Sequence, residues 1–393
     1  MRCRLDQIGI SARAAVSALG WGAGPHVDAM RQMRSGLRAC DLDTVDLPCF
    51  IGRVDGIEEL AFPPAQAAFD NRATRLVMAA ACEDGFRDHV DRAVARWGAS
   101  RVGLVIGTST SGVERLEQVY RDRDADAPLA ESYTIRHHND HHAVTAFLEE
   151  YLGVAGPVFT VSTACSSSAK SLVDAAQLIQ LGICDAVVSG GVDSLCMTSL
   201  YGFEALELVS RQPCRPADAD RDGLSIGEAA GLLLLERGSE GPFLSGYGES
   251  SDAVNMSTPP PDGAGAATAM SAALLRAALT PQDVSFVKLH GTATPINDQA
   301  ETTAVAAVVP GTAATSLKGL VGHTLGAAGA LETVMCLDAM EAGIVPGTAG
   351  LQSKDPAIAI EIPTATVETP VHHVVCNAFG FGGSNCALVL SAQ

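Results

Sequence analysis

Three observations predict an α/β fold for this chain of 393 residues. Short aliphatic runs at residues 101–107, 185–190 and 230–236 have the composition of strands that are buried on both faces. Helix-forming segments alternate with such runs along the sequence. Hydrophobic residues make up 47% of the chain and charged residues 18%, as in a compact globular protein. This alternation indicates layers of helices packed on largely buried sheets.

The remaining elements follow in chain order. We interpret the short apolar pieces after the basic N-terminus as a first strand and not as a cleaved signal. Further strands are expected at 157–162, 284–290 and 374–377, where the runs are short and rich in β-branched residues. No apolar run reaches about 18 residues, so we expect no membrane span. Helices are expected between the strands, at residues 75–86, 169–181, 266–279, 299–309 and 327–343.

Charge and cysteine content exclude several classes of protein. A net charge of −19 leaves no overall basic surface for nucleic acid, and an acidic partner would need a local basic patch. The eleven cysteines are irregularly spaced and form no Cys-x-x-Cys pair, which indicates reduced thiols in the cytoplasm and neither a disulfide framework nor a zinc site. The length predicts roughly two or three domains.

Cys165 is the strongest candidate for a nucleophile. It lies in the run Val161-Ser-Thr-Ala-Cys-Ser-Ser-Ser-Ala-Lys170, between an expected strand and an expected helix. Unpaired N–H groups and the positive end of the helix dipole favour a thiolate there, and small neighbours leave the sulfur reachable. The alternative is inert packing, because a free cysteine often behaves as a small hydrophobe. The position makes Cys165 a candidate for covalent catalysis.

Three further stretches concentrate residues that can do chemistry. His290 follows an expected strand, His323 lies in a glycine-lined turn before an expected helix, and residues 377–385 form a glycine-rich loop. Each has a structural alternative when taken singly. A phosphate-binding loop at 380–383 is excluded, because no Gly-Lys-Ser/Thr follows it. The run 136–142 holds four histidines, for which a polar loop is a simpler explanation than a metal site.

Together these motifs resemble the β-ketoacyl-acyl carrier protein synthases, the condensing enzymes of the thiolase superfamily. The resemblance runs nearly end to end. It implies a thiolase-like five-layered αβαβα sandwich with two pseudo-repeated halves, residues 1–240 with the nucleophile and 241–393 with both histidines. The matching motifs are Thr-Ala-Cys-Ser-Ser at 163–167, Arg215-Pro-Ala-Asp-Ala-Asp-Arg-Asp-Gly223 leading to Gly227-Glu-Ala-Ala-Gly231, His290-Gly-Thr-Ala-Thr294, Lys318 with Gly322-His323, and Gly380-Phe-Gly-Gly383.

The resemblance implies a Cys-His-His site formed by Cys165, His290 and His323. Lys318 would be a fourth member, and Glu301 would be its ionic partner. These groups would carry the covalent and electrostatic parts of the reaction.

The resemblance also assigns the residues around the reacting groups. The backbone N–H groups of Cys165 and Phe381 would form the oxyanion hole. Phe381 would also gate the acyl pocket, whereas Phe379 is expected to be packing. Thr292 and Thr294 would hydrogen-bond the phosphopantetheine arm, although they could instead only cap the following turn.

The implied reaction is a decarboxylative Claisen condensation. An acyl chain moves from acyl carrier protein or CoA to Cys165, malonyl-loaded carrier protein loses carbon dioxide, and the enolate attacks the acyl group to give a 3-ketoacyl product. Neutral imidazoles at His290 and His323 would hold the enolate oxygen, which burial and the charge of Lys318 favour. We expect no cofactor of the protein's own and no metal, because the phosphopantetheine arrives on the carrier protein.

The chain departs from the family pattern at three places. Lys288 and Leu289 replace a small or acidic pair before the first histidine, Asn297-Asp298 replaces Gly-Asp after the threonine loop, and Ala229 replaces a glycine. None of these changes removes a reacting group. They favour a specialised polyketide or aryl-polyene system over the housekeeping fatty-acid enzyme.

Basic residues suggest where an acidic carrier protein would dock. Arg72 and Arg75 lie where the resemblance places docking residues, and Arg211 and Arg215 could extend the patch. Internal salt bridges or solvated helix faces explain each arginine equally well.

Two other functions are compatible with the same fold. A chain-length-factor-like subunit typically lacks the nucleophile, so Cys165 with both histidines favours catalysis. A thiolase would use a second late cysteine, for which Cys376 and Cys386 are candidates, but the block from Lys318 to His323 fits the decarboxylating branch. Because the family dimerises through a strand next to the nucleophile, we expect a homodimer, or a heterodimer with a homologous ketosynthase or chain-length-factor subunit.

Overall fold

The computed structural model describes residues 8–124, 126–130 and 133–393. Our interpretation of the first seven residues therefore lies outside the described part of the chain. The described chain opens with strand β1 (Ile8–Ser17), which is buried at both of its ends.

The first half of the chain builds a mixed sheet of five strands. Its order is β6 (Val158–Val161), β5 (Val102–Gly107), β7 (Ala186–Asp193), β9 (Ala229–Arg237) and β1. The first three strands run parallel, and β9 is antiparallel to both of its neighbours. Parallel β5 and β7 require crossover connections, which the intervening helices provide.

The second half repeats the same pattern. Its order is β12 (Ala314–Thr315), β11 (Phe286–Lys288), β15 (His373–Gly380), β16 (Ser384–Ser391) and β10 (Phe243–Ser251). Again the first three strands are parallel and the fourth is antiparallel to both neighbours. A short ladder between β1 and β10 joins the halves into one eleven-stranded sheet, with the small β2 (Gly20–Trp21) beside β1.

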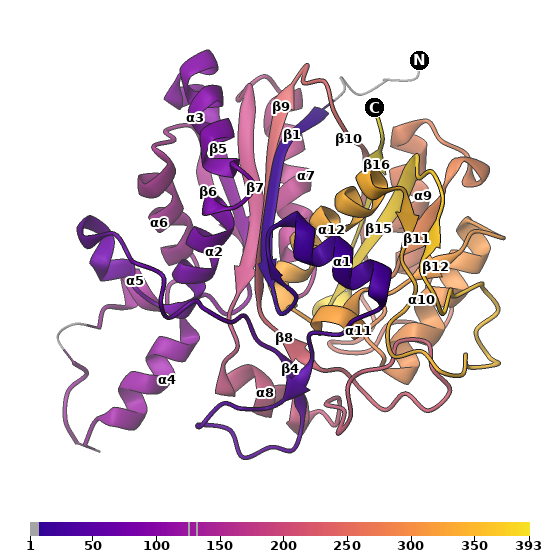
Figure 1. Cartoon of the computed structure of the whole chain (residues 1–393), viewed down its shortest axis with the longest axis horizontal. Helices are drawn as coiled ribbons and strands as arrows, with labels where there is room; N and C mark the ends of the chain where they lie inside the picture. The colour runs from indigo at the N-terminus through magenta and orange to yellow at the C-terminus, as the bar shows by residue number, and fades with distance from the viewer. Residues whose placement is uncertain (1–7, 125, 131–132) are drawn as a thin grey trace.

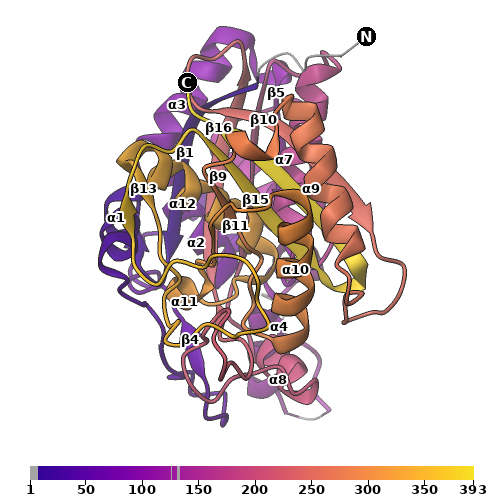
Figure 2. The ribbon, with the colours of Figure 1, turned by 90° about the vertical axis from the view of Figure 1, so that its right-hand side faces the viewer.

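Helices cover both halves of this sheet and fill the space between the halves. The predicted five-layered αβαβα sandwich with two repeated halves is therefore confirmed. Figure 1 shows α7 and α12 between the two halves of the sheet, and Figure 2 shows α9 and α10 in front of the second half. The outer helices of the first half pack on β1, β5, β6, β7 and β9. The covering helices are α2 (Arg72–Cys82), α3 (Phe86–Trp97), α6 (Ala143–Leu152), α7 (Ser167–Gln180), α9 (Ala264–Ala277), α10 (Pro295–Val308) and α12 (Ala328–Ala342).

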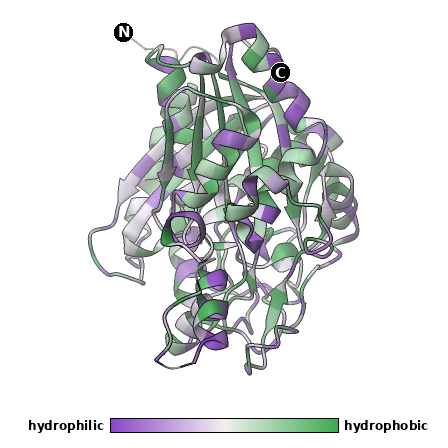
Figure 3. Ribbon diagram, turned by 90° about the vertical axis from the view of Figure 1, so that its left-hand side faces the viewer, coloured by the Kyte–Doolittle hydropathy of each residue, from purple (hydrophilic) through white to green (hydrophobic). Residues whose placement is uncertain are grey.

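Three apolar cores correspond to the three helical layers. Adjacent strand residues point into different cores: Val187 of β7 faces the central layer and Val188 faces the outer layer of the first half. In β16, Leu388 faces the central layer and Val389 the outer layer of the second half. Figure 3 shows hydrophobic residues along the central strands and along the helices that cover them. Burial on both faces explains why these strands appear in the sequence as continuous apolar runs.

Shorter elements surround this sandwich. None of the helices in the described ranges combines the length and the apolarity that a bilayer crossing needs. These elements are α1 (Ala23–Gln32), α4 (Val113–Asp122), α5 (Ile135–His138), α8 (Met197–Ala205), α11 (Lys318–Val321), β3 (Arg38–Ala39), β4 (Phe50–Gly52), β8 (Ile226–Gly227), β13 (Ile344–Val345) and β14 (Val367–Glu368).

The predicted strands and helices named above are confirmed, with ends that differ by a few residues. Strand β10 was not predicted, because two of its four buried positions are glycines, Gly246 and Gly248, and it lacks a β-branched run. Most of the outer helices of the first half were also not predicted. The predicted division into residues 1–240 and 241–393 remains a proposal.

Close packing of the two central helices predicts a sensitive position at Gly329. A Cβ added there would lie 2.5 Å from the backbone nitrogen of Ala169 in α7, closer than real contacts allow. We expect Gly329→Ala to lower the free energy of unfolding by about 1–3 kcal/mol, because the two helices must move apart. Urea denaturation followed by circular dichroism measures this change.

Gly202 in α8 is the matched control, because a Cβ there meets nothing within 4 Å. Gly202→Ala should leave stability unchanged or raise it by up to about 1 kcal/mol, since alanine is the better helix former. Equal midpoints for wild type and Gly329→Ala would contradict the close packing.

Candidate active site

Cys165 sits on a strained turn between β6 and α7. Ala164, the residue before it, has a φ of +53°, which alanine adopts only where surrounding structure enforces it. The hydroxyl of Ser167 braces the turn by accepting from the backbone N–H of Thr163 at 2.9 Å. Gly107 of β5 lets the helix approach, because a Cβ there would lie 2.4 Å from the backbone nitrogen of Ser168. The turn therefore fixes the sulfur at the start of the central helix layer.

His323 comes from the second half and reaches the sulfur directly. It follows α11 and Gly322, whose φ of +77° turns the chain. Its backbone is held from both sides, donating to the carbonyl of Ser225 at 2.7 Å and accepting from the N–H of Gly227 at 2.9 Å. Its Nε2 lies 3.0 Å from the Sγ of Cys165. The pair therefore has the geometry of a nucleophile and its proton acceptor.

His290 completes the group from the end of β11. The carboxylate of Glu301 accepts from the backbone N–H groups of His290 at 2.7 Å and Gly291 at 2.8 Å. The imidazole meets that of His323 edge to face, with ring centroids 5.2 Å apart. One side-chain atom each of Cys165, His290 and His323 lies within 4.8 Å of the others. The structure thus brings together the three predicted reacting residues.

The three side chains face a cavity of about 450 Å³. Phe203 of α8 and Phe381 stand across it, with ring centroids 5.6 Å apart. The loop after β10 forms part of the wall. The cavity is large enough for a small acyl group or the end of a prosthetic arm. Its lining includes Cys165, His290, His323, Thr292, Thr294, Phe379, Phe381, Leu206, Leu208, Leu224, Asn255 and Met256.

The predicted ion pair between Lys318 and Glu301 is wrong. Lys318 Nζ lies 2.7 Å from Glu332 Oε1 in α12, and both side chains are buried. Glu301 instead accepts from backbone N–H groups and from the side-chain amide of Asn377 at 3.0 Å. Glu301 therefore positions the backbone of His290, and Glu332 is the ionic partner of Lys318.

Burial sets the protonation of both histidines. Burial first, and the nearby charge of Lys318 second, hold the pKa of His290 and of His323 well below the ordinary value. Lys288 contributes in the same direction for both rings. Both imidazoles are therefore neutral at physiological pH, as the sequence analysis anticipated.

The thiol of Cys165 differs from the thiolate that the sequence analysis favoured. Burial raises the pKa of Cys165 to about 11, although the charge of Lys318 and the backbone N–H of Phe381 act in the opposite direction. The stabilisation of a thiolate by the helix N-terminus is smaller than the cost of removing that thiolate from water. Deprotonation must therefore accompany the reaction, and His323 Nε2 is the base in contact.

The predicted oxyanion and arm-binding residues lie around the same sulfur. The backbone N–H groups of Phe381 and of Cys165 itself both act to lower the pKa of the Cys165 thiol. Thr292 and Thr294 line the cavity, and their hydroxyl groups are 2.9 Å apart. Thr294 precedes α10, but its side chain makes no capping hydrogen bond, so the capping alternative does not describe it. Their roles toward a substrate remain predictions.

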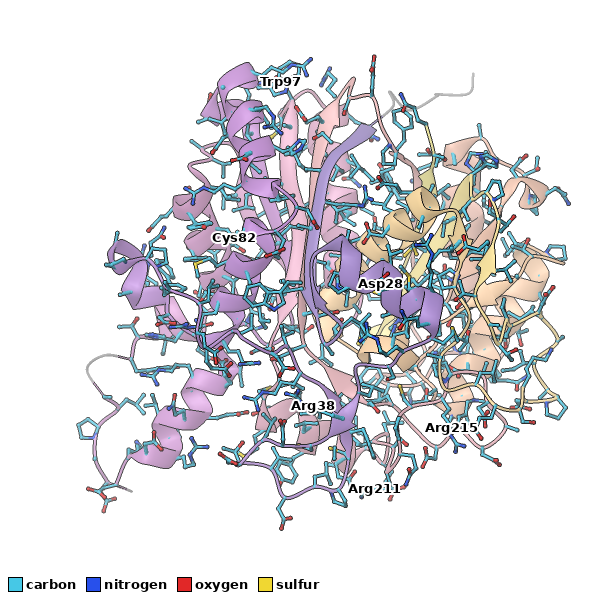
Figure 4. All side chains as sticks on the ribbon, in the orientation of Figure 1. Asp28, Arg38, Cys82, Trp97, Arg211 and Arg215 are labelled. Carbon is cyan, nitrogen blue, oxygen red and sulfur yellow. The ribbon has the colours of Figure 1, made fainter. Side chains whose placement is uncertain are left out.

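The predicted docking arginines are engaged inside the protein. Arg72 pairs with Glu228 and Glu58, and its side chain is 14% exposed. Arg75 pairs with Asp70. These contacts match the alternative of internal salt bridges. Figure 4 places the other two candidates, Arg211 and Arg215, at the lower edge of the molecule in that view, where they contact Glu204 and Asp218.

Other candidate groups lie apart from the cavity. His141 Nε2 contacts the carbonyl of Ser109, and His142 Nδ1 contacts the hydroxyl of Thr160. In the described part of the chain the histidine run forms no cluster with metal-ligand spacing. Cys376 and Cys386 are buried in the central core and do not line the cavity, which disfavours the thiolase alternative.

Sequence reasoning missed Glu332, Lys288 and Phe203. Glu332 had only a weak signal: it is an acidic residue in a helix that is buried over most of its length, but the same helix holds Asp338 and Glu341 as well. Lys288 was noticed only as a departure from a pattern. Phe203 contacts both His323 and Phe381, and nothing in the local sequence indicates this.

Comparisons with known protein families agree with this geometry. A profile of the β-ketoacyl synthase N-terminal domain matches residues 41–241, and a profile of the C-terminal domain matches residues 243–352. Nodulation protein E of Rhizobium leguminosarum bv. trifolii is 31% identical over 376 residues, which cover 91% of this chain and 93% of that protein. The 3-oxoacyl-[acyl-carrier-protein] synthase 2 of Vibrio cholerae is 31% identical over 314 residues, covering 74% of this chain and 76% of that protein.

Other matches are shorter or structural. The mitochondrial 3-oxoacyl-[acyl-carrier-protein] synthase of Arabidopsis thaliana is 37% identical over 264 residues, which span 61% of this chain and 57% of that protein. A chain from the complex of the ketosynthase ApeO with its chain length factor ApeC from Xenorhabdus doucetiae superimposes with a TM-score of 0.91. That match has 34% identity and covers 99% of this chain and 98% of the other.

The buried thiol predicts a steep pH dependence for alkylation of Cys165. Because its pKa is about 11, the thiolate fraction and the rate with iodoacetamide should rise roughly tenfold per pH unit between pH 7 and pH 10. Lys318→Met should slow alkylation at pH 8, since it removes a charge that favours the thiolate. Peptide mass mapping of Cys165 measures the rate.

Lys170→Met is the control, because Lys170 pairs with Glu249 at 2.9 Å and belongs to no contact of the sulfur described above. It should leave the profile unchanged. A plateau in the wild-type rate below pH 8 would show a preformed thiolate and contradict the assignment.

Proposed function

Because the chain belongs to the β-ketoacyl synthase family of acyltransferases, we propose that it condenses an acyl group held on Cys165 with malonyl-loaded acyl carrier protein. The product is 3-ketoacyl-acyl carrier protein, and carbon dioxide is released. One observation carries the proposal: the sulfur of Cys165 and the imidazoles of His290 and His323 come from opposite halves of the fold and meet in one cavity.

The first step moves the acyl group to the enzyme. As the thiol of Cys165 loses its proton to His323 Nε2, the sulfur attacks the thioester carbonyl. The N–H groups of Cys165 and Phe381 stabilise the tetrahedral oxyanion. The carrier thiol leaves with the proton, so the enzyme returns to neutral histidines and carries a thioester.

The second step forms the carbon–carbon bond. The malonyl carboxylate leaves as carbon dioxide, and its electron pair becomes the enolate of the carrier thioester. His290 and His323 stabilise the enolate oxygen through N–H groups. For His323 this needs the tautomer with its proton on Nε2, opposite to the one that accepts the thiol proton in the first step, so its proton exchanges with solvent between the two steps. Neutral imidazoles are required, because an imidazolium would protonate the carbanion. The carbanion attacks the acyl carbonyl, and the sulfur of Cys165 leaves as a thiolate that takes up a proton from solvent.

The substrates and the biological setting are part of the proposal. Thr292 and Thr294 offer hydroxyl groups to the phosphopantetheine arm, which arrives on the carrier protein, so the enzyme needs no cofactor or metal of its own. The departures at Lys288 and Ala229 favour polyketide or aryl-polyene biosynthesis over housekeeping fatty-acid synthesis. We place the reaction in the cytoplasm. A carrier protein would dock through a local basic patch, for which Arg211 is a candidate with 47% of its side chain exposed.

The alternative function is that of a chain-length-factor-like subunit without chemistry. The ketosynthase and its chain length factor occur together in the Xenorhabdus doucetiae complex that resembles this chain. The intact reacting group favours the catalytic role for this chain, and leaves the non-catalytic role to a homologous partner.

Loss of the nucleophile gives the direct test of the function. Wild-type protein with acyl- and malonyl-loaded carrier protein should acquire an acyl adduct on Cys165 and release 3-ketoacyl product, both seen by intact mass spectrometry. Cys165→Ala should form no adduct and lower condensation by at least about 10³-fold. Cys214→Ala is the control, because Cys214 is buried but absent from the cavity lining. A wild-type protein that forms neither adduct nor product would contradict the proposal.

Strand β6 offers the edge for a partner subunit. In the described residues it pairs with β5 only, and all four of its residues are partly exposed. The backbone carbonyls of Pro157 and Val161 accept from the N–H groups of Leu104 in β5 and of Thr108 just after it. Because successive backbone N–H groups of a strand point to opposite sides, the N–H of Thr160 points to the open edge. Pairing with a homologous subunit there would place the dimer interface next to Cys165.

A proline substitution in the edge strand β6 tests the predicted dimer interface. We expect light scattering to give a mass of twice 40.5 kDa, alone or after coexpression with a homologous subunit. Thr160→Pro removes an edge N–H and should give the 40.5 kDa monomer. Monomeric wild type under both conditions would contradict the predicted dimer.

A further inference from the structure

Two buried lysines share one carboxylate behind the catalytic histidines. Lys318 Nζ lies 2.7 Å from Glu332 Oε1, and Lys288 Nζ donates to Oε2 of the same group. Both lysine side chains are 0% exposed, and Glu332 is 1% exposed. Two ammonium groups on one carboxylate leave this contact set with one excess positive charge. A lysine is almost never fully buried unless it is paired with an acidic group.

Lys288 is also tied to the frame that holds His290. The two residues are two positions apart at the end of β11, where alternate side chains face the same side of the sheet. Lys288 Nζ donates to the carbonyl of Asn377 in β15. The side-chain amide of Asn377 donates to Glu301, which accepts from the backbone N–H of His290. Lys288 therefore links β11 to two other elements, β15 and α12, behind the histidine.

The charged and titratable groups that face the two imidazoles come from several elements. Cys165 lies before α7, Lys318 begins α11, Lys288 ends β11, and Glu332 lies in α12. The buried thiols of Cys376 in β15 and Cys336 in α12 act on Lys288 from the same side. Glu301 of α10 faces His290 through its backbone N–H, and contacts neither lysine by an ion pair. Without Lys288, the pair of Lys318 and Glu332 would be neutral overall.

We propose that Lys288 is a positioning residue for the condensation, whose buried ammonium keeps His290 and His323 from taking up a second proton and fastens β11 to β15 and α12. The proposal rests on the function proposed above. It assigns to Lys288 no contact with substrate and no proton transfer. Its effect reaches the reaction through the protonation state of the imidazoles.

Two electrostatic observations support this role. Burial alone would lower the pKa of the Lys288 ammonium, but Cys376, Glu332 and Cys336 raise the value above the ordinary one, so the charge persists. Burial, Lys318 and Lys288 all lower the pKa of His323. Burial and Lys318 are the leading influences on the pKa of the Cys165 thiol, and Lys288 is not among the leading ones. The two lysines therefore have distinguishable effects.

Neutralising Lys288 should move the acid limb of the pH–rate profile of decarboxylation. A histidine whose folded pKa is low stays neutral until the pH falls through that value, and removal of a nearby positive charge raises it. Lys288→Met should therefore shift the acid limb of malonyl-carrier decarboxylation upward by about one pH unit, with KM changed less than about threefold. Lys288→Gln should give the same shift, and it keeps a donor for the carbonyl of Asn377 should the methionine variant fail to fold.

Three comparisons separate this role from loss of structure. Lys354→Met is the matched control, because Lys354 is exposed and donates only to the carbonyl of Ile360; it should leave the limb unchanged. The pH profile of Cys165 alkylation should change less in Lys288→Gln than in Lys318→Met, because Lys318 is the leading charge that acts on the thiol. A change in thermal midpoint with an unmoved acid limb would mean a purely structural residue and would overturn the proposal.

Nuclear magnetic resonance of protein with ¹⁵N-labelled histidine gives a readout that needs no turnover. The signals of His290 and His323, assigned with His290→Gln and His323→Gln, should titrate at higher pH in Lys288→Gln than in wild type. An upward shift in an enzyme without condensation activity would contradict only the proposed function. Unshifted signals in an active enzyme would contradict only the role of Lys288.

Discussion

The sulfur of Cys165 meets the imidazoles of His290 and His323 where water is nearly excluded, and this exclusion sets the protonation of all three. A buried thiol resists ionisation and a buried imidazole resists a second proton. The reacting groups therefore begin neutral, and charge appears only as the reaction proceeds. Fixed N–H groups, at Phe381 for example, stabilise such charge without having to reorganise.

The doubled architecture explains how these groups meet. One half supplies the nucleophile from the turn between β6 and α7, and the other supplies both histidines from the ends of β11 and α11. The central helices α7 and α12 pack against each other with little tolerance, because Gly329 lies against Ala169. The same packing places Glu332, one turn further along α12, beside both buried lysines. Helix packing and the electrostatics of the site are therefore determined together.

The layered fold and the reacting residues could be predicted from the sequence, but the ionic and hydrogen-bonding partners of those residues could not. Strands such as β5 and β7 were predictable because burial on both faces leaves uninterrupted apolar runs. Cys165 was predictable from its turn, but its protonation was not, because burial exceeds the helix dipole only once the tertiary structure excludes water. Glu301 and Glu332 are both buried acids near the site, and only the packing of α12 decides which one meets Lys318.

One carboxylate for two lysines is a costly arrangement unless the excess charge has a use. Removing an ion from water costs several kcal/mol even in relaxed protein interiors, and a single carboxylate offsets only one ammonium fully. The enolate formed on decarboxylation brings negative charge to His290 and His323, in front of Lys288 and Lys318. The excess positive charge keeps both imidazoles neutral in the resting enzyme, so that their N–H groups can donate to the enolate oxygen as its charge develops. An interaction that is stronger in the transition state than in the ground state accelerates the chemical step.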